Sequence, residues 1–249
     1  ATQRHWPGYC VACGSGRGFR IPWVDGMPPG SLRESLACIN CGCNARQRAV
    51  AGVMLGGFEA PPRPGIYLTE QASSLYVALR RRFPGMVGGE FQPSPAKRLK
   101  LSTWLWRRRV FEWVRHRDAT ALAFSGGSLD AILCLDVLEH VSDFRAALRE
   151  FARVLKADGE LLLTVPWYWG RAESREIARL RAGGGIDFLQ QPPEYHGDPL
   201  GGGVLCFHHF GWDLLDAMRE AGFAQAEALR VSDPERGLPE AQWVLRARR

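Results

Sequence analysis

Four cysteines within the first 41 residues have the spacing of a metal site. Cys10 and Cys13 form one Cys-x-x-Cys-Gly motif, and Cys38 and Cys41 form a second. Two intervening residues let both thiolates face one ion, and the following glycine permits the tight turn that brings backbone N–H groups to the sulfurs. Two such motifs predict a tetrahedral zinc site with four cysteine ligands. Because four protein ligands leave no open position, we expect the zinc to stabilise a module at residues 1–60 and to have no catalytic role.

Two other uses of these cysteines are disulfide bonds and an iron–sulfur cluster. No apolar signal segment is apparent, so we expect a cytoplasmic protein, where disulfides are rare. Cys43 is then a spare thiol or a substitute ligand. The residues that follow, 44–55, have the pattern of a helix. Its Arg46 and Arg48 either meet a phosphate or carboxylate or remain solvated.

A second group of chemically useful residues follows a predicted strand. Residues 131–135 form a continuous apolar run, typical of a strand that is buried on both faces. Asp136, Glu139 and His140 come directly after it. Open α/β sheets bind ligands at the carboxyl ends of their strands, so these side chains are candidates for a binding site. Alternatively, they are polar loop residues that cap the next helix.

The next two elements complete a βαβ unit. Apolar residues recur at helical spacing between 144 and 155, with Ser142 as the expected N-cap and Gly159 as the expected end. Residues 161–165 form a second apolar strand, which Pro166 stops. Strand, helix and strand in this order predict two parallel strands with a right-handed crossover.

This unit carries a family resemblance. The stretch L-D-A-I-L-C-L-D-V-L-E-H-V, followed by K-A-D-G-E-L-L-L-T-V-P, resembles the second half of class I S-adenosylmethionine-dependent methyltransferases. The resemblance is close over about forty residues and looser over residues 64–249. It implies an α/β fold with a Rossmann-like, mostly parallel seven-stranded sheet and an antiparallel last strand. We assign this domain to residues 61–249, and the implied reaction is methyl transfer from S-adenosylmethionine to an oxygen or nitrogen.

The resemblance also implies where the cofactor binds. Glu90, at the end of a strand over residues 86–91, corresponds to the carboxylate that accepts hydrogen bonds from both ribose hydroxyls. Asp118 and Ala119, after a third strand that begins at residue 115, correspond to the adenine contacts. Glu70 and the loop from Asp136 to His140 correspond to the methionine end. The implied cofactor-binding residues are Thr69, Glu70, Gln71, Glu90, Phe91, Asp118, Ala119, Asp136, Val137 and His140.

The first half of the domain departs from the family pattern. The expected acid-x-Gly-x-Gly loop is replaced by Glu70-Gln71-Ala72-Ser73-Ser74, which follows a strand over residues 66–69 and precedes a helix starting near Ser73 or Ser74. In the family, the glycines of this loop allow the backbone to approach the methionine part of the cofactor closely, and this chain lacks them. One alternative is therefore a non-catalytic binding protein on a degenerate methyltransferase fold.

Residues 167–208 form a predicted acceptor-binding insertion or lid, because they are polar and contain two glycine triplets. Trp167, Tyr168 and Trp169 begin it, and flat aromatic surfaces suit an organic ring or a sugar face. We favour a small-molecule acceptor such as a sugar or a natural-product scaffold. Candidate general bases are His196, His140 and His208. The candidate substrate-binding residues are Trp167, Tyr168, Trp169, Tyr195, His196 and His209.

A basic stretch gives the alternative acceptor, RNA. Residues 97–117 contain eight Lys or Arg residues, three tryptophans and one acid, in a chain of net charge +6. Basic residues between aromatic ones bind single-stranded nucleic acid in other proteins. An RNA methyltransferase would use this stretch together with the cysteine module. The simpler interpretation is a helix whose tryptophans pack on the sheet. No apolar run is long enough to span a membrane, and nothing indicates an oligomeric state.

Overall fold

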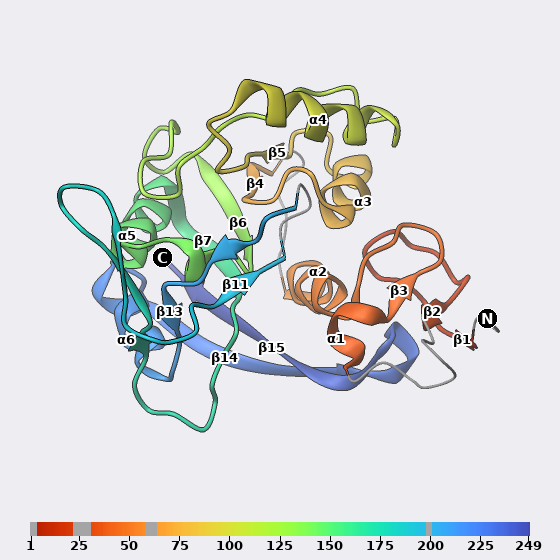
Figure 1. Cartoon of the computed structure of the whole chain (residues 1–249). Helices are drawn as coiled ribbons and strands as arrows, with labels where there is room; N and C mark the ends of the chain where they lie inside the picture. Colours follow the sequence, from red (N-terminus) through yellow and green to blue (C-terminus); the bar gives the residue numbers. More distant parts are fainter. Residues whose placement is uncertain (1–3, 22–30, 58–63, 198–200) are drawn as a thin grey trace.

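The structure is a computed structural model that describes residues 4–21, 31–57, 64–197 and 201–249. Its centre is one sheet with the strand order β14-β15-β7-β6-β4-β5 (Figure 1). The four strands from β7 to β5 are parallel, and β15 runs antiparallel to both of its neighbours. This confirms the Rossmann-like α/β prediction, including the antiparallel last strand. The strands are β4 (Ile66–Leu68), β5 (Val87–Gly88), β6 (Leu129–Leu135), β7 (Leu155–Thr164), β14 (Gln225–Asp233) and β15 (Leu238–Arg248).

The described part of the sheet has six strands, whereas seven were predicted. At the position of the third strand, a single parallel bridge joins Glu90 to His116. It consists of two backbone hydrogen bonds, from Glu90 to Arg115 and from Arg117 to Glu90, each 2.9 Å long. The pairing stops there because Asp118 accepts hydrogen bonds from Thr120 and closes a turn. Residues 115–118 also contain no apolar side chain that would bury a longer strand.

Strand β6 is buried on both faces, as predicted, and its side chains belong to two separate cores. Ile132 and Cys134 pack on the side of α5 (Phe144–Val154) and α6 (Asp213–Glu220). Leu133 and Leu135 pack on the opposite side. Helix α5 begins one residue later than expected, because Asp143 and not Ser142 is its N-cap and accepts from the Ala146 N–H. The helix ends at Val154, well before Gly159, and β7 begins at the next residue, Leu155.

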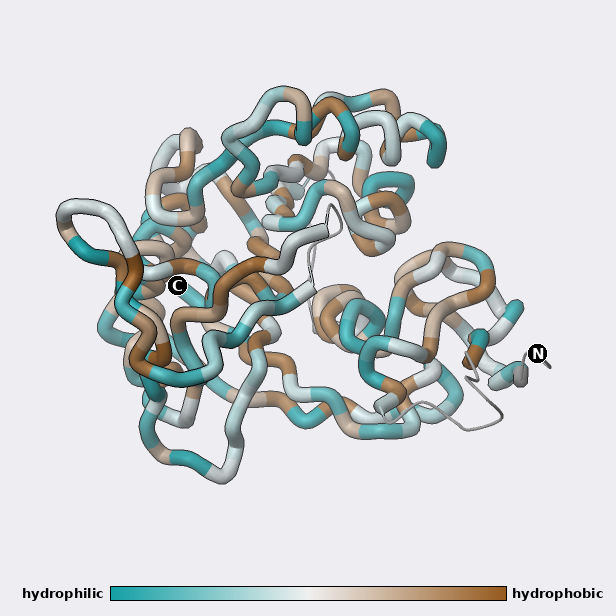
Figure 2. The backbone as a smooth tube through the Cα atoms, in the orientation of Figure 1, coloured by the Kyte–Doolittle hydropathy of each residue, from teal (hydrophilic) through white to brown (hydrophobic). Residues whose placement is uncertain are grey.

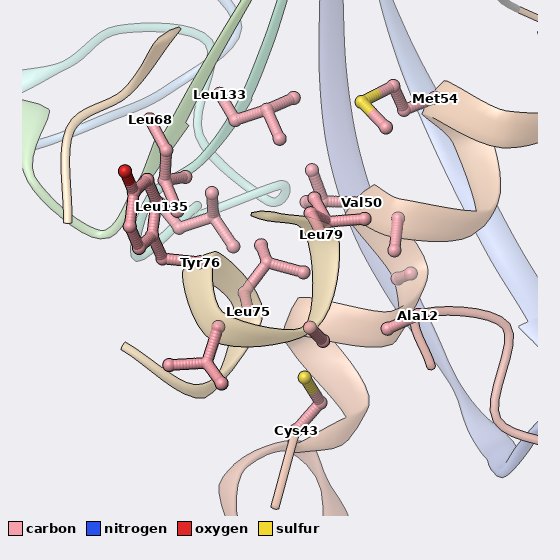
Figure 3. Packing of buried hydrophobic residues seen from close by; sticks show 14 of the residues in the cluster. Ala12, Cys43, Val50, Met54, Leu68, Leu75, Tyr76, Leu79, Leu133 and Leu135 are labelled. Carbon is pink, nitrogen blue, oxygen red and sulfur yellow. The ribbon is translucent and has the colours of Figure 1, made fainter. Parts of the chain in front are cut away.

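The opposite face is covered by α2 (Ala45–Gly57) and α3 (Ser74–Arg82), with α4 (Pro95–Trp106) beyond them. Figure 3 shows Val50 of α2 against Leu79 of α3, beside Leu133 of the sheet. The predicted helix at residues 44–55 is thus confirmed, and α3 has the expected Ser73 N-cap. Helix α2 follows the cysteine motifs directly, so the cysteine module and the sheet share one continuous core.

The cysteine module consists of a three-stranded sheet and a short helix. Its elements are β1 (Arg4–Trp6), β2 (Phe19–Ile21), α1 (Leu32–Ser35) and β3 (Ala37–Cys38). In the described segments of the whole chain, no helix combines the length and hydrophobicity needed to cross a bilayer.

The insertion after β7 is built from short paired strands. A hairpin of β9 and β10 projects from the body, and Figure 2 shows its tip as pale where glycines 183–185 lie. Two further pairs, β11 with β12 and β13 with β8, lie closer to the sheet. The strands are β8 (Arg175–Glu176), β9 (Ala178–Leu180), β10 (Ile186–Phe188), β11 (Tyr195–His196), β12 (Val204–Leu205) and β13 (His208–His209), and the short helices η1 (Leu138–His140) and η2 (Pro234–Arg236) complete the fold.

Arg48 of α2 ties the cysteine module to the end of the chain. Its side chain is fully buried. The guanidinium donates to the carbonyls of Leu36 and Cys43 at 2.9 and 2.5 Å and to those of Arg236 and Gly237 at 3.3 and 2.6 Å. The sequence left two alternatives for Arg48, solvation or a phosphate or carboxylate partner, and both were wrong. Burial lowers its pKa, while the nearby cysteine sulfurs oppose that change.

We expect Arg48→Met to lower the free energy of unfolding by at least about 3 kcal/mol, because it leaves four buried carbonyls without their donor. Denaturant unfolding followed by circular dichroism measures this loss. The control is Arg20→Met on the exposed side of β2, which should stay within about 0.5 kcal/mol of the parent. Equal effects of the two substitutions would contradict a structural role for the Arg48 hydrogen bonds.

Candidate active site

Three carboxylates meet at the carboxyl edge of the sheet, as the resemblance implied. Glu70 follows β4, Asp136 follows β6, and Glu90 lies just beyond β5, where its Oε1 accepts from the Ala72 N–H at 2.7 Å. Burial raises the pKa of Glu70 to about 8. Arg46 opposes this rise in pKa, whereas the Glu90 and Asp136 carboxylates add to it. The structure therefore brings these groups together around a half-buried carboxyl group.

The predicted adenine contacts lie at the next turn along this edge. Oδ1 of Asp118 accepts from the Thr120 N–H and hydroxyl at 2.8 and 2.7 Å. Both bonds fall on one oxygen, so Oδ2 is available to a ligand amino group. Phe91 is 67% exposed, and its ring lies 5.3 Å from that of His116. An exposed aromatic ring beside His116, at the same edge of the sheet, is suited to stacking on a base.

Three other predicted cofactor residues have mainly structural contacts. The Gln71 side chain is buried and bonds the Arg115 N–H and the Trp113 carbonyl at 3.0 and 3.2 Å. Thr69 is buried beside β6, and its backbone N–H donates to the Leu133 carbonyl. Val137 is half-buried at the start of η1. Their roles toward the cofactor stay predictions.

Two arginines, Arg33 of α1 and Arg46 of α2, reach the carboxyl end of β6; the sequence analysis gave Arg33 no role and left a carboxylate partner as one alternative for Arg46. Arg33 Nη2 lies 2.9 Å from Asp136 Oδ1, and Arg46 Nε lies 3.2 Å from Asp136 Oδ2. Thr164 also donates to Oδ1 at 2.8 Å. Burial alone would raise the pKa of Asp136, but the two arginines outweigh it and lower this pKa. The cysteine module therefore contributes directly to the site.

Arg46 keeps one donor unused. Its Nε and Nη2 contact the Glu34 carboxylate at 2.8 and 3.3 Å, whereas the buried Nη1 has no hydrogen-bond partner among the described residues. Of the two sequence alternatives for Arg46, the carboxylate contact is confirmed. A buried guanidinium donor without a partner costs free energy, so this position favours an anionic ligand.

The four predicted metal ligands are gathered in one cluster. The Sγ atoms of Cys10 and Cys41 are 3.8 Å apart, as are those of Cys13 and Cys38. A tetrahedral zinc site with Zn–S bonds of about 2.3 Å requires sulfur separations of about 3.8 Å. The cluster therefore fits structural zinc. Cys43 is buried nearby and donates no ligand to this group of four.

A second polar cluster joins η1 to the insertion. Glu139, His140 and His196 place potential ligand atoms within 4.8 Å of one another, and Glu194, Cys206 and His209 form a similar group beside them. Glu139 raises the pKa of His196 to about 9; burial opposes this, and Glu194 supports it. Protonation is the opposite of what a general base needs. The sequence analysis gave no role to Glu194, whose Oε2 lies 2.8 Å from Nε2 of His209.

His208, the third candidate base, lies apart from this cluster. It is buried between the rings of Phe144 and Phe210, with centroid distances of 4.9 and 5.7 Å. Its Nε2 bonds the Ser142 carbonyl at 3.1 Å, and burial lowers its pKa. These contacts are those of a core histidine.

The predicted aromatic wall divides between two places. Trp167 and Trp169 line a cavity of about 390 Å³ together with Trp243, Arg33 and Glu240. Tyr168 instead lies against His209, with ring centroids 4.5 Å apart, and Tyr195 is exposed on β11. The tryptophan cavity and the histidine cluster thus have no residue in common.

The basic stretch uses two of its tryptophans in packing. Trp104 stacks against the Arg108 guanidinium at 3.6 Å, and Trp106 meets Trp113 edge-on at 4.9 Å and donates to the Glu112 carbonyl. Trp113 is still 62% exposed. The packing accounts for Trp104 and Trp106 without a nucleic-acid partner.

Known proteins resemble this chain. The family model of a methyltransferase domain matches residues 78–163. Nocamycin O-methyltransferase of Saccharothrix syringae is 28% identical over 188 residues, which cover 73% of this chain and 67% of that protein. The uncharacterized methyltransferase YcgJ of Bacillus subtilis (strain 168) is 50% identical over 54 residues, which cover 21% of each protein. The [4+2]-cyclase SpnF has the same fold, with a TM-score of 0.50 at 16% identity over 85% of this chain and 88% of that one.

We expect the purified chain to hold about one zinc ion, and Cys38→Ser to lose it, because three thiolates hold zinc less tightly than four. Metal analysis after gel filtration measures the content. Cys43→Ala is the matched control, since Cys43 lies outside the group of four, and it should keep the ion. Zinc loss in the control and retention in Cys38→Ser would contradict the ligand assignment.

Proposed function

We propose that this S-adenosylmethionine-dependent methyltransferase, so identified by its matched domain and its relatives, methylates an oxygen or nitrogen of a small molecule. The observation that carries the proposal is a row of acidic side chains along one edge of the sheet, in the order Asp136, Glu70, Glu90 and Asp118. Their order along the sheet matches the extended shape of a nucleoside with an amino-acid tail. A small-molecule acceptor is further supported by a relative that is named as an O-methyltransferase of nocamycin.

The residues present fit the cofactor without the usual glycine motif. Glu70 offers a carboxylate to the ammonium group of the methionine part, and the unused Nη1 of Arg46 offers a donor to its carboxylate. Glu90 suits the ribose hydroxyls, and Asp118 suits the adenine amino group. In this arrangement, Arg46 of the cysteine module supplies the contact that backbone N–H groups of a glycine-rich loop would otherwise make.

When bound, the cofactor supplies a sulfonium methyl group with a good leaving group. The protein therefore mainly has to hold the acceptor atom in line with that group. The tryptophan-lined cavity supports an acceptor with a ring or sugar face, because Trp167, Trp169 and Trp243 offer flat apolar surfaces. Arg33 and Glu240 at the same cavity offer polar contacts that would orient it.

Calorimetric titration with S-adenosylhomocysteine tests the cofactor site. We expect micromolar binding that weakens at least about tenfold in Glu90→Ala and in Asp118→Ala, because each substitution removes hydrogen-bond acceptors for the nucleoside. Glu220→Ala is the matched control, because this acid on α6 is 66% exposed and pairs with Arg145, away from the site. A folded protein that does not bind at millimolar ligand would sink the proposal.

The affinity for S-adenosylhomocysteine should rise between pH 6 and pH 8, by up to about tenfold per pH unit. Glu70 has a pKa of about 8, so at lower pH its carboxyl group must lose a proton before it can pair with the ligand ammonium group. Glu70→Gln removes this titration and should flatten the profile. Titrations at four pH values measure the slope, and a flat profile for the parent protein would contradict the assignment of Glu70.

A further inference from the structure

Glu139 is a buried acid without a hydrogen-bond partner among the described residues. Its side chain is fully inaccessible, and both carboxylate oxygens lack a donor there. It belongs to η1, directly after the strand end that carries Asp136. An ionised carboxylate in this position is costly unless a cation or a donor pairs with it. In the metal-free protein, His196 is the nearest group that can carry a positive charge, and no described group donates a hydrogen bond to the Glu139 side chain.

Two imidazoles face this carboxylate at a distance that is too long for a hydrogen bond. Nδ1 of His196 lies 3.6 Å from Glu139 Oε1, and Nε2 of His140 lies 3.8 Å from the same atom. All three ligand atoms lie within 4.8 Å of one another. Ligands of one metal ion at about 2.0–2.2 Å are about 3–3.5 Å apart, so small side-chain shifts complete the geometry.

Hydrogen bonds on the far sides of both rings direct the correct nitrogen atoms toward the centre. Nδ1 of His140 bonds the Leu205 carbonyl at 2.8 Å, and a carbonyl can only accept, so Nε2 carries the lone pair. Nε2 of His196 lies 2.9 Å from Glu194 Oε1, which leaves Nδ1 to face Glu139. Glu194 is held in turn by His209 at 2.8 Å. Such outer carboxylate and carbonyl partners are typical of metal-binding histidines.

We propose that Glu139, His140 and His196 bind a divalent transition-metal ion, separate from the ion of the cysteine cluster. Two imidazoles and one carboxylate suit zinc, iron, manganese or cobalt, and three ligands leave coordination positions open for a substrate. The metal also neutralises the buried Glu139 charge. Glu194 is a positioning residue that orients His196.

The open positions give the ion a role in the reaction. Glu139 lies three residues after Asp136, in the short helix that follows β6, so the ion lies at the same end of the sheet as the expected methionine end of the cofactor. An acceptor hydroxyl bound to the metal loses its proton to water more easily. The oxygen lone pair then forms the new C–O bond, while the C–S bond breaks and its electron pair returns to sulfur. This role rests on the proposed methyl transfer to oxygen, whereas the site itself rests on the three side chains.

Cobalt titration of the full chain, with its cysteine cluster first filled with zinc, tests the site. We expect one further equivalent of Co²⁺ to bind and to give visible absorption bands of nitrogen and oxygen coordination. Glu139→Gln, His140→Asn and His196→Asn should each weaken this binding at least about 100-fold, and Glu194→Gln by about 10- to 100-fold. The matched control is His5→Asn, an exposed histidine of β1, which should bind Co²⁺ like the parent.

Thermal unfolding gives a second measurement on the same variants. Added Co²⁺ should raise the melting temperature of the parent and of His5→Asn, but not of Glu139→Gln, while metal-free Glu139→Gln should be at least as stable as the metal-free parent because it lacks the buried charge. No second equivalent in the parent, or unchanged binding in Glu139→Gln and His196→Asn, would overturn the site. Binding of S-adenosylhomocysteine is measured in parallel, so loss of the metal site and loss of the proposed function are distinguished.

Discussion

The burial of two arginine charges on α2 is the constraint on which the rest of this structure depends. A buried guanidinium must be surrounded by acceptors, because the cost of removing it from water is large. Arg48 obtains four carbonyls, two from the cysteine module and two from the loop before β15. Arg46 obtains Glu34 and Asp136. These requirements fix the cysteine module against the sheet and place α1 and α2 beside the carboxyl end of β6.

The site contains more acid than base, and that imbalance explains its electrostatics. Glu70, Glu90, Asp136 and Glu139 crowd the ends of neighbouring strands. Asp136 is neutralised by Arg33 and Arg46, so its pKa is lowered. Glu70 has no comparable ion pair within the described segments, and its pKa is raised. The proposed ligands, a cofactor ammonium group and a divalent metal ion, are both cations. Each would occupy the position where a carboxylate has too few positive neighbours.

Local patterns in the sequence predicted the parts of the fold that depend on near neighbours. The apolar run of β6, the periodic apolar face of α5 and the two Cys-x-x-Cys motifs each follow from residues that are close together in the chain. The Arg33–Asp136 pair joins residues that are 103 positions apart, and the Glu139–His196 contact joins η1 to the insertion. No periodicity encodes such contacts. The predicted third strand is reduced to a single bridge for a related reason. Its pairing ends at the turn of Asp118, and no apolar run in the sequence indicates that turn.

The four carbonyls around Arg48 also impose an order on folding during synthesis. Leu36 and Cys43 emerge from the ribosome with the arginine, but Arg236 and Gly237 are translated 188 and 189 residues later. Until then the nascent helix has a guanidinium that it cannot bury with all its partners. The cysteine module therefore reaches its final packing only after the last strand is available. Until then, the apolar residues that pack against the sheet in the folded protein are exposed, and an exposed apolar surface favours aggregation.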